Sequence, residues 1–90
     1  MLQITICHSE NTVRVADIKD TSSLQILSEF DDNTKKISLE PLKNHIGEKV
    51  MISHYNYDKK SGQYNFDDEY VRTLTNVGVD SDNLEYFEYN

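Results

Sequence analysis

The residues best suited to chemistry lie near the C-terminal end of the chain, between positions 67 and 90. This stretch contains seven carboxylates and a single base, Arg72, whereas the first 66 residues contain nine acids and eight bases. Carboxylates attract Lys and Arg side chains over long distances, and tyrosine rings supply contact area at interfaces. The combination indicates a surface that binds a basic protein. The candidate contact residues are Asp67, Asp68, Glu69, Tyr70, Asp80, Asp82, Glu85, Tyr86, Glu88 and Tyr89.

The overall charge excludes some partners and favours others. The 90 residues carry a net charge of −7. Phosphate backbones and anionic membranes would repel such a chain, so direct binding to nucleic acid or to a membrane is not expected. A basic protein that itself binds nucleic acid, such as a nuclease, fits the charge better. The simpler alternative is that the acidic surface only keeps a small protein in solution.

No residue pattern marks a catalytic or cofactor site. The three glycines are isolated from one another, and the three histidines and single cysteine lack the spacing of a zinc site. Asp80 and Asp82 are spaced like the start of a calcium-binding loop, but Glu85 stands where that loop requires glycine. Cys7 and His8 are adjacent in a strand-like segment, where neighbouring side chains point to opposite faces. We therefore expect no catalytic residues, no metal, no cofactor and no enzymatic activity.

Length and cysteine content indicate one small domain, residues 1–90, in a reducing compartment. The single cysteine cannot form an internal disulfide. No apolar run approaches the ~18 residues of a membrane-spanning helix, and no basic segment precedes an apolar one at the N-terminus. We expect a cytoplasmic protein, located in the host cytoplasm if a phage encodes it.

The first half of the chain predicts a hairpin, an ambiguous segment and a helix. Apolar residues alternate in residues 2–7 and 13–15, and a polar turn at 8–11 separates the two runs. Residues 20–30 fit either a short amphipathic helix or a strand. Residues 36–47 predict a helix of about two turns, with proline in the first turn and glycine after the last. Its apolar stripe would consist of Leu39, Leu42 and Ile46.

The second half predicts an antiparallel meander. Residues 50–57 alternate as a strand, residues 58–62 form a turn and residues 64–66 return, which makes a second hairpin. We expect acidic turns at 67–69 and 80–83, a strand at 70–79 and a last strand at 84–89. Four aromatic residues should pair across the hairpin, namely Tyr55, Tyr57, Tyr64 and Phe66. The predicted fold class is α+β, a single antiparallel sheet with one or two short helices.

The segment from Leu42 to Tyr89 resembles a small SH3-like or Sm-like barrel, in which a helix leads into a strongly bent sheet. The resemblance rests on the spacing Leu42-x3-Ile46-Gly47-x2-Val50 and covers about half of the chain. It implies a barrel-like C-terminal half. RNA binding is not implied, because the basic residues expected of an Sm-like protein are absent.

Strand periodicity limits how the C-terminal acids can be arranged. In a final strand Glu85 would point with Phe87 and Tyr89, whereas Glu88 would point with Tyr86. These two acids cannot then form one row that imitates a ladder of phosphates. The acidic turns at 67–69 and 80–82 are better placed to cluster, if both lie at the same end of the sheet.

Two non-enzymatic hypotheses follow, and a third, an enzyme, would need a pocket with convergent polar groups. In the first, the protein is a small acidic non-enzymatic inhibitor of a basic nucleic-acid-processing protein, in which acids speed the encounter and tyrosines hold the complex. Phage anti-defence proteins, including anti-CRISPR inhibitors, and nuclease-immunity proteins are often small acidic chains of this kind. In the alternative, the protein is a β-rich structural or regulatory module that self-associates, for example as a homodimer, through its exposed last strand.

Overall fold

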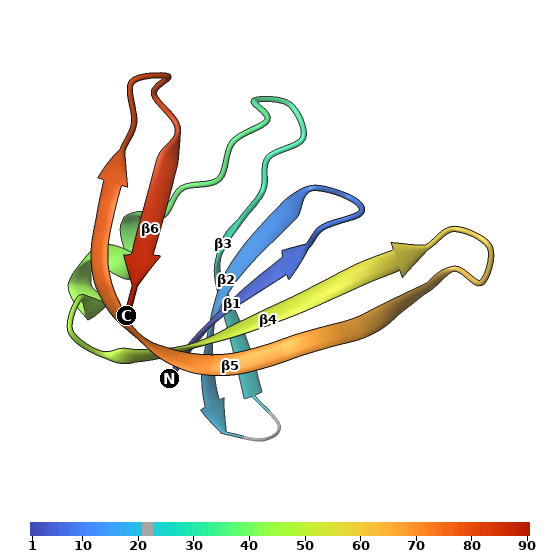
Figure 1. The fold of residues 1–90 in the computed structure, drawn as a ribbon, viewed down its shortest axis with the longest axis horizontal. Coiled ribbons are helices and arrows are strands. Elements are labelled where there is room, and N and C mark those ends of the chain that lie inside the picture. The colour runs from blue at the N-terminus through green and yellow to red at the C-terminus, as the bar shows by residue number, and fades with distance from the viewer. Residues whose placement is uncertain (21–22) are drawn as a thin grey trace.

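The computed structural model describes residues 1–20 and 23–90 and forms one curled sheet (Figure 1). Its strands are β1 (Leu2–Cys7), β2 (Thr12–Asp20), β3 (Ser23–Glu29), β4 (Lys49–Asp58), β5 (Gln63–Val79) and β6 (Glu85–Tyr89). The described residues contain one helical element, the 3-10 helix η1 (Glu40–His45), and no helix in them is long and apolar enough to cross a membrane. With 62% strand and 7% helix, the fold is mostly β, and the α+β prediction is wrong.

The sheet is mixed rather than antiparallel. Its strand order is β3-β2-β1-β4-β5-β6, and β1 pairs antiparallel with β2 but parallel with β4. Ile4 of β1 accordingly lies between Val15 of β2 and Ile52 of β4. β3 pairs with the edge of β2 that faces away from β1. The next strand, β4, is therefore added at the other edge of β1. The segment 20–30 therefore contains a strand, β3, although residues 21 and 22 lie outside the described residues.

Residues 63–79 form one 17-residue strand where two strands and an acidic turn were predicted. The register of β4 against β5 shifts between His54 and Tyr55, which leaves Asp67 without an opposite residue. Such a bulge lets the acidic run remain within a strand. β5 pairs with β4 along residues 63–73 and with β6 along residues 74–79, and it bends strongly between the two (Figure 1).

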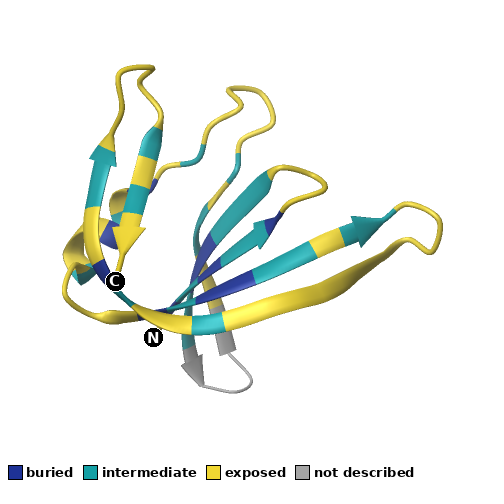
Figure 2. Ribbon diagram, viewed as in Figure 1, coloured by how far each residue is buried: buried dark blue, intermediate teal, exposed yellow. Residues whose placement is uncertain are grey.

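The hydrophobic core lies on one face of this curled sheet. Its fully buried side chains come from four strands and η1, and Figure 2 shows that buried positions gather where the strands converge. We call the face that carries Ile4, Val15 and Ile52 the inner face, and the opposite face the outer face. The core cluster consists of Leu2, Ile4, Val15, Leu39, Leu42, Val50, Ile52 and Leu74.

The helix predicted at 36–47 is shorter and wound more tightly than expected. Pro41 lies in its first turn and Gly47 has a φ of +93°, as the sequence indicates. Leu39 and Leu42 are buried, but Ile46 is 47% exposed. Ile46 already has extended backbone angles after the 3-10 turns end, so it leaves the apolar stripe.

Candidate functional site

The ten predicted contact residues fall into three separate groups. Four lie in the middle of β5, two lie in the turn between β5 and β6, and four lie on β6. Figure 1 shows this turn far from the middle of β5. The prediction that acids 67–69 and 80–82 form two turns at one end of the sheet is therefore wrong, because residues 67–69 belong to a strand.

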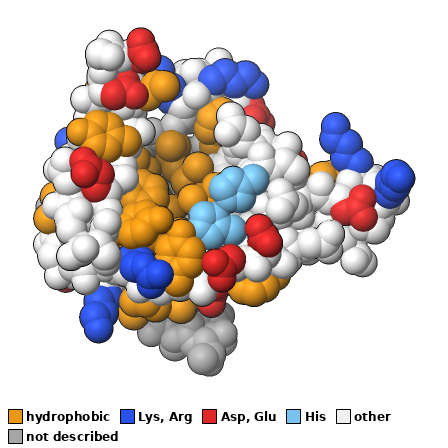
Figure 3. All heavy atoms as spheres, in the orientation of Figure 1, with side chains coloured by type: hydrophobic (Ala, Val, Ile, Leu, Met, Phe, Trp, Pro, Cys, Tyr) orange, Lys and Arg blue, Asp and Glu red, His pale blue; other side chains and the backbone are white. Residues whose placement is uncertain are grey.

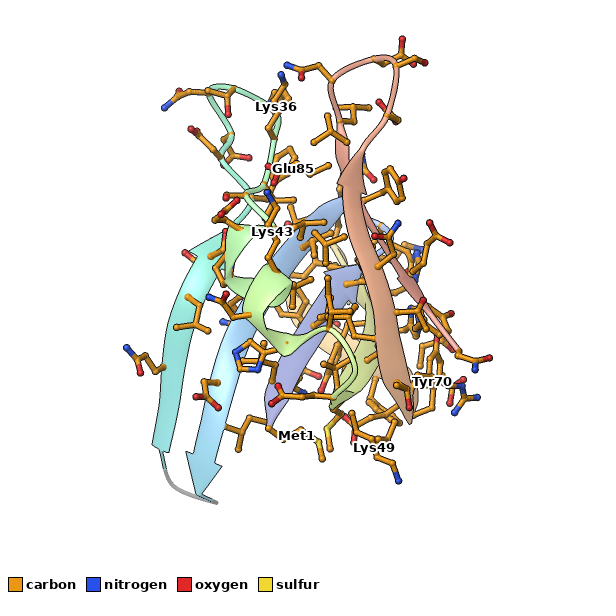
Figure 4. All side chains as sticks on the ribbon, turned by 90° about the vertical axis from the view of Figure 1, so that its left-hand side faces the viewer. Met1, Lys36, Lys43, Lys49, Tyr70 and Glu85 are labelled. Atoms are coloured by element: carbon orange, nitrogen blue, oxygen red, sulfur yellow. The ribbon has the colours of Figure 1, made fainter. Side chains whose placement is uncertain are left out.

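The carboxylates of β6 are used within the domain. Glu85 accepts a hydrogen bond from the backbone N–H of Leu39 at 3.1 Å, and Figure 4 shows it on the side of β6 that carries η1 and Lys43. Glu88 accepts a hydrogen bond from the side-chain amide of Asn76 at 3.3 Å. Both acids therefore stabilise the β5–β6 hairpin and its packing, and they are less suited to hold a partner.

Tyr70 and Tyr89 belong to a chain of hydrogen bonds on the inner face. The Tyr70 hydroxyl lies 3.2 Å from the Tyr89 hydroxyl and 2.8 Å from Nε2 of His54. Nδ1 of His54 lies 2.7 Å from Nε2 of His8, and Figure 3 shows histidine side chains beside a hollow lined by hydrophobic ones. These hydrogen bonds link the turn after β1 to β4, β5 and β6. Within the described ranges, no group of three or more His, Cys, Asp or Glu side chains is placed to hold a metal ion.

Replacing Tyr89 with phenylalanine should lower the pKa of Tyr70. The hydrogen bond from Tyr89, with burial as a second cause, raises the pKa of Tyr70 above its ordinary value of 10.0. The fold thus favours the neutral phenol, and the stability gained is present below pH ~10 and is lost as the pH rises through the raised pKa. NMR titration of ¹³C-labelled tyrosine measures the change. Tyr86→Phe, on the other face of β6, should leave the Tyr70 pKa unaltered.

If Tyr89→Phe left the pKa of Tyr70 where it was, the two hydroxyls would not be bonded in solution. The hydrogen bonds of the inner face would then end at Tyr70, and the C-terminal end of β6 would be held by its backbone and by ring packing on Tyr70 and Phe87. That backbone contact is made by Thr73 and Asn90, which exchange hydrogen bonds at 2.9 and 3.4 Å.

The hairpin formed by β4 (Lys49–Asp58) and residues 63–73 of β5, which we call the β4–β5 arm, carries aromatic side chains on its outer face. Tyr55 lies opposite Phe66 and Tyr57 opposite Tyr64, with ring centroids 5.6 and 4.9 Å apart, so these sequence-predicted pairs are confirmed. Tyr64 and Phe66 are each 59% exposed. Figure 2 shows this arm projecting from the sheet with most of β5 exposed. Large rings exposed next to each other are typical of an interaction site.

Three consecutive acids, Asp67, Asp68 and Glu69, follow these rings on β5. The Ser53 hydroxyl donates a 2.6 Å hydrogen bond to Glu69, and Ser53 in turn accepts one from Gln3 at 2.9 Å. Among the described residues, no strand pairs with residues 63–72 of β5 on the side away from β4. The acids therefore line a free edge of the sheet beside the exposed rings.

Side chains cover part of this free edge. Asp68 accepts a hydrogen bond from the backbone N–H of Glu69 at 2.8 Å. Arg72 donates to the carbonyl oxygen of Val71 at 2.9 Å, with its guanidinium 4.6 Å from the ring centroid of Tyr70. Charged side chains at an edge hinder indiscriminate strand pairing. The edge is thus protected against a second copy of the same chain.

A pocket of about 570 Å³ opens on the outer face between the β4–β5 arm and the end of β3. Cys7 at its base is 6% exposed, and its thiol lies 3.6 Å from a carboxylate oxygen of Glu10. His8 instead contacts His54 on the inner face, so the adjacent Cys7 and His8 are separated as predicted. The pocket was not predicted, because its residues come from separate segments. Those used below are Arg14, Glu29, Phe30, Asp32, Tyr55 and Tyr64.

The β4–β5 arm carries three features that could bind a partner. Exposed rings and a pocket lie on its outer face, and a row of acids lies along its free edge, where Asp68 is opposite the inner-face His54. No protein-family model matches the sequence, and no curated protein and no solved structure matches the chain.

Proposed function

We propose that this protein is a non-enzymatic inhibitor that binds a basic nucleic-acid-processing protein through the outer face and the free β5 edge of the β4–β5 arm. The observation that carries the proposal is the position of two exposed rings, Tyr64 and Phe66, directly before three acids on a free sheet edge. The acids attract and orient a surface that otherwise holds phosphate, and the rings bury apolar area once contact is made. A phage anti-defence protein or a nuclease-immunity protein in the cytoplasm would act in this way.

The proposed contact surface differs from the one that composition suggested. Asp67, Asp68 and Glu69 remain in it, and the rings of Tyr64 and Phe66 take the place of the β6 tyrosines. Glu85 and Glu88 are excluded because they lie on β6, apart from the exposed rings of the β4–β5 arm. At protein interfaces, aromatic side chains usually supply much of the affinity, and charged side chains raise the association rate. The rings and acids of this arm fit that pattern.

Self-association is the second candidate, and the position of β6 at the edge of the sheet favours it. Tyr86 and Tyr89 on this strand are 38% and 44% exposed. Pairing through β5 is disfavoured, because two antiparallel copies would bring their acidic runs together. Sedimentation over a range of concentrations separates the candidates. A dimer that persists at high salt and ignores basic proteins would support self-association over the inhibitor.

The test of the inhibitor proposal compares the wild-type chain with a variant carrying Asp67→Asn, Asp68→Asn and Glu69→Gln. These amides keep the oxygens that accept hydrogen bonds from Ser53 and from the backbone, so the fold should be retained. Each tagged chain is used to capture proteins from the native cell or host, and the captured protein is then purified. Its binding to and cleavage of nucleic acid are measured as either chain is added.

The wild-type chain should inhibit the purified target at a near-stoichiometric ratio. The neutralised variant should associate at least ~10-fold more slowly at low salt, and the difference should shrink as salt screens the charges. A control, Asp80→Asn with Asp82→Asn, removes two charges at the remote β5–β6 turn and should inhibit like wild type. Equal association rates for the wild-type and neutralised chains at low salt would contradict the proposal, as would a target without a basic surface.

A further inference from the structure

The outer-face pocket combines the two kinds of group that hold a guanidinium ion. The rings of Tyr55, Tyr64 and Phe30 line it, together with the carboxylates of Glu29 and Asp32. Its volume of about 570 Å³ falls within the range of ~300–1,000 Å³ found for ligand sites. Guanidinium groups stack on aromatic faces and pair with carboxylates in the same plane. The lining therefore favours a planar cation.

The balance of charge around the pocket also favours a cation. Arg14 is the one basic residue among those that line it, and it lies opposite Glu29 in the β2–β3 ladder. Among the described residues Asp32 makes no ion pair, so its carboxylate is available to a ligand. Glu10 adds a further negative charge beside Tyr64. An anionic ligand would meet three carboxylates for one guanidinium, which makes it a poor occupant.

The two tyrosine rings are held by their neighbours before any ligand arrives. Tyr55 packs edge-on against Phe66, with an angle of 75° between the rings. Tyr64 packs on Tyr57 with ring centroids 4.9 Å apart, and the interaction of its hydroxyl with Glu10 raises the pKa of Tyr64 above its ordinary value. Rings that are already positioned lose less entropy when a side chain stacks on them.

We propose that this pocket receives an arginine side chain of the basic partner, stacked on Tyr64 and paired with Asp32. The proposal rests on the proposed function and names the anchor of the same interface. Arginine is preferred to lysine because its cation is planar, more weakly hydrated and able to form two parallel hydrogen bonds with a carboxylate. Arginine is also among the residues that most often dominate binding energy at interfaces.

The test uses a small probe in place of the partner. Nα-acetyl-arginine-methylamide is titrated into the ¹⁵N-labelled protein and followed by NMR. Amide shifts should change around Thr5, Cys7, Arg14, Tyr55 and Tyr64, with a millimolar dissociation constant. The lysine derivative should bind several-fold more weakly, and the uncharged citrulline derivative at least ~10-fold more weakly, since a tenfold change is the loss of one modest charge pair.

Two variants and two matched controls locate the site. Asp32→Asn and Tyr64→Leu, both at exposed positions, should each weaken arginine binding by about 5- to 10-fold. Asp82→Asn and Tyr86→Leu make the same chemical changes outside the pocket and should have no effect. Shifts spread over all acidic segments, or equal binding of the citrulline derivative, would overturn the inference.

This test can fail independently of the proposed function. A protein that does not bind arginine but still inhibits a basic target would keep the inhibitor role and reject the pocket. A protein whose pocket binds arginine but whose acidic edge has no effect on any basic target would keep the pocket and reject the inhibitor role.

Discussion

Replacing Ile52 with alanine should lower the free energy of unfolding by about 3 kcal/mol. Ile52 is 1% exposed and lies on β4 between Ile4 of the parallel neighbour β1 and Tyr70 of the antiparallel neighbour β5. The substitution loses buried apolar area and leaves a cavity that strands paired on both sides cannot easily close. A domain of this size has only about 5–10 kcal/mol of stability in total. The variant should therefore lose a large share of its stability.

Urea denaturation measures the effect as a lower midpoint with an unchanged slope. The matched control is Ile26→Ala on β3, where the side chain is 48% exposed and the expected loss is below ~1 kcal/mol. Similar losses for the two variants would mean that Ile52 does not lie at the centre of the core. The parallel pairing of β1 with β4, which places Ile52 there, would then be wrong.

The hairpins could be predicted from the sequence because the residues that form them are close together. Alternation with period two marks β1, β2 and β4, and the turns contain residues that accept a positive φ. Asn11, Gly62 and Asn83 have φ values of +54°, +70° and +63°, one in each of the three hairpin turns that lie entirely within the described residues. Each of these signals lies within a dozen residues of the structure that it specifies.

The parallel pair and the long β5 could not be predicted in the same way. Local sequence does not show which edge of β1 is still unpaired when β4 is added. The pairing of Ile4 with Ile52 therefore depends on the path of the chain after β3. Aspartate is disfavoured in strands, so the acidic run 67–69 carries no local signal for a strand. Pairing with β4 outweighs that preference, since the acids lie at an exposed edge and the bulge at Asp67 relieves the register.

The candidate site was predicted only in part, for a similar reason. The alternation of Tyr55, Tyr57, Tyr64 and Phe66 is a visible signal for a shared aromatic face, and that face exists. The distribution of charge in the sequence locates the acids, but it does not show which carboxylates accept hydrogen bonds from within the domain. The pocket brings Asp32 close to Tyr64, two residues with 31 positions between them, and no spacing rule connects them.

Replacing Leu42 with alanine should cost about 2–5 kcal/mol of stability, whereas Ile46→Ala should cost less than ~1 kcal/mol. An amphipathic α-helix over residues 36–47 would bury both side chains on one stripe. In the structure Leu42 is fully buried in η1, but Ile46 follows the last 3-10 turn in an extended conformation and is 47% exposed. The two substitutions remove aliphatic side chains of the same size, so their difference reports burial alone.

The comparison is made by urea denaturation of the two variants beside wild type, with the far-ultraviolet circular dichroism spectrum as a check that the sheet is intact. A large loss for Leu42→Ala alone supports a short 3-10 helix that inserts one residue between the walls of the curled sheet. Equal large losses for the two variants would instead support the amphipathic helix of about two turns, in which Ile46 is buried. Gly47 donates its N–H to the carbonyl oxygen of Leu74 at 2.8 Å, so the segment after η1 is fixed to the point at which β5 starts to bend. Truncation of Leu42 should therefore also raise the local mobility of the β5–β6 hairpin.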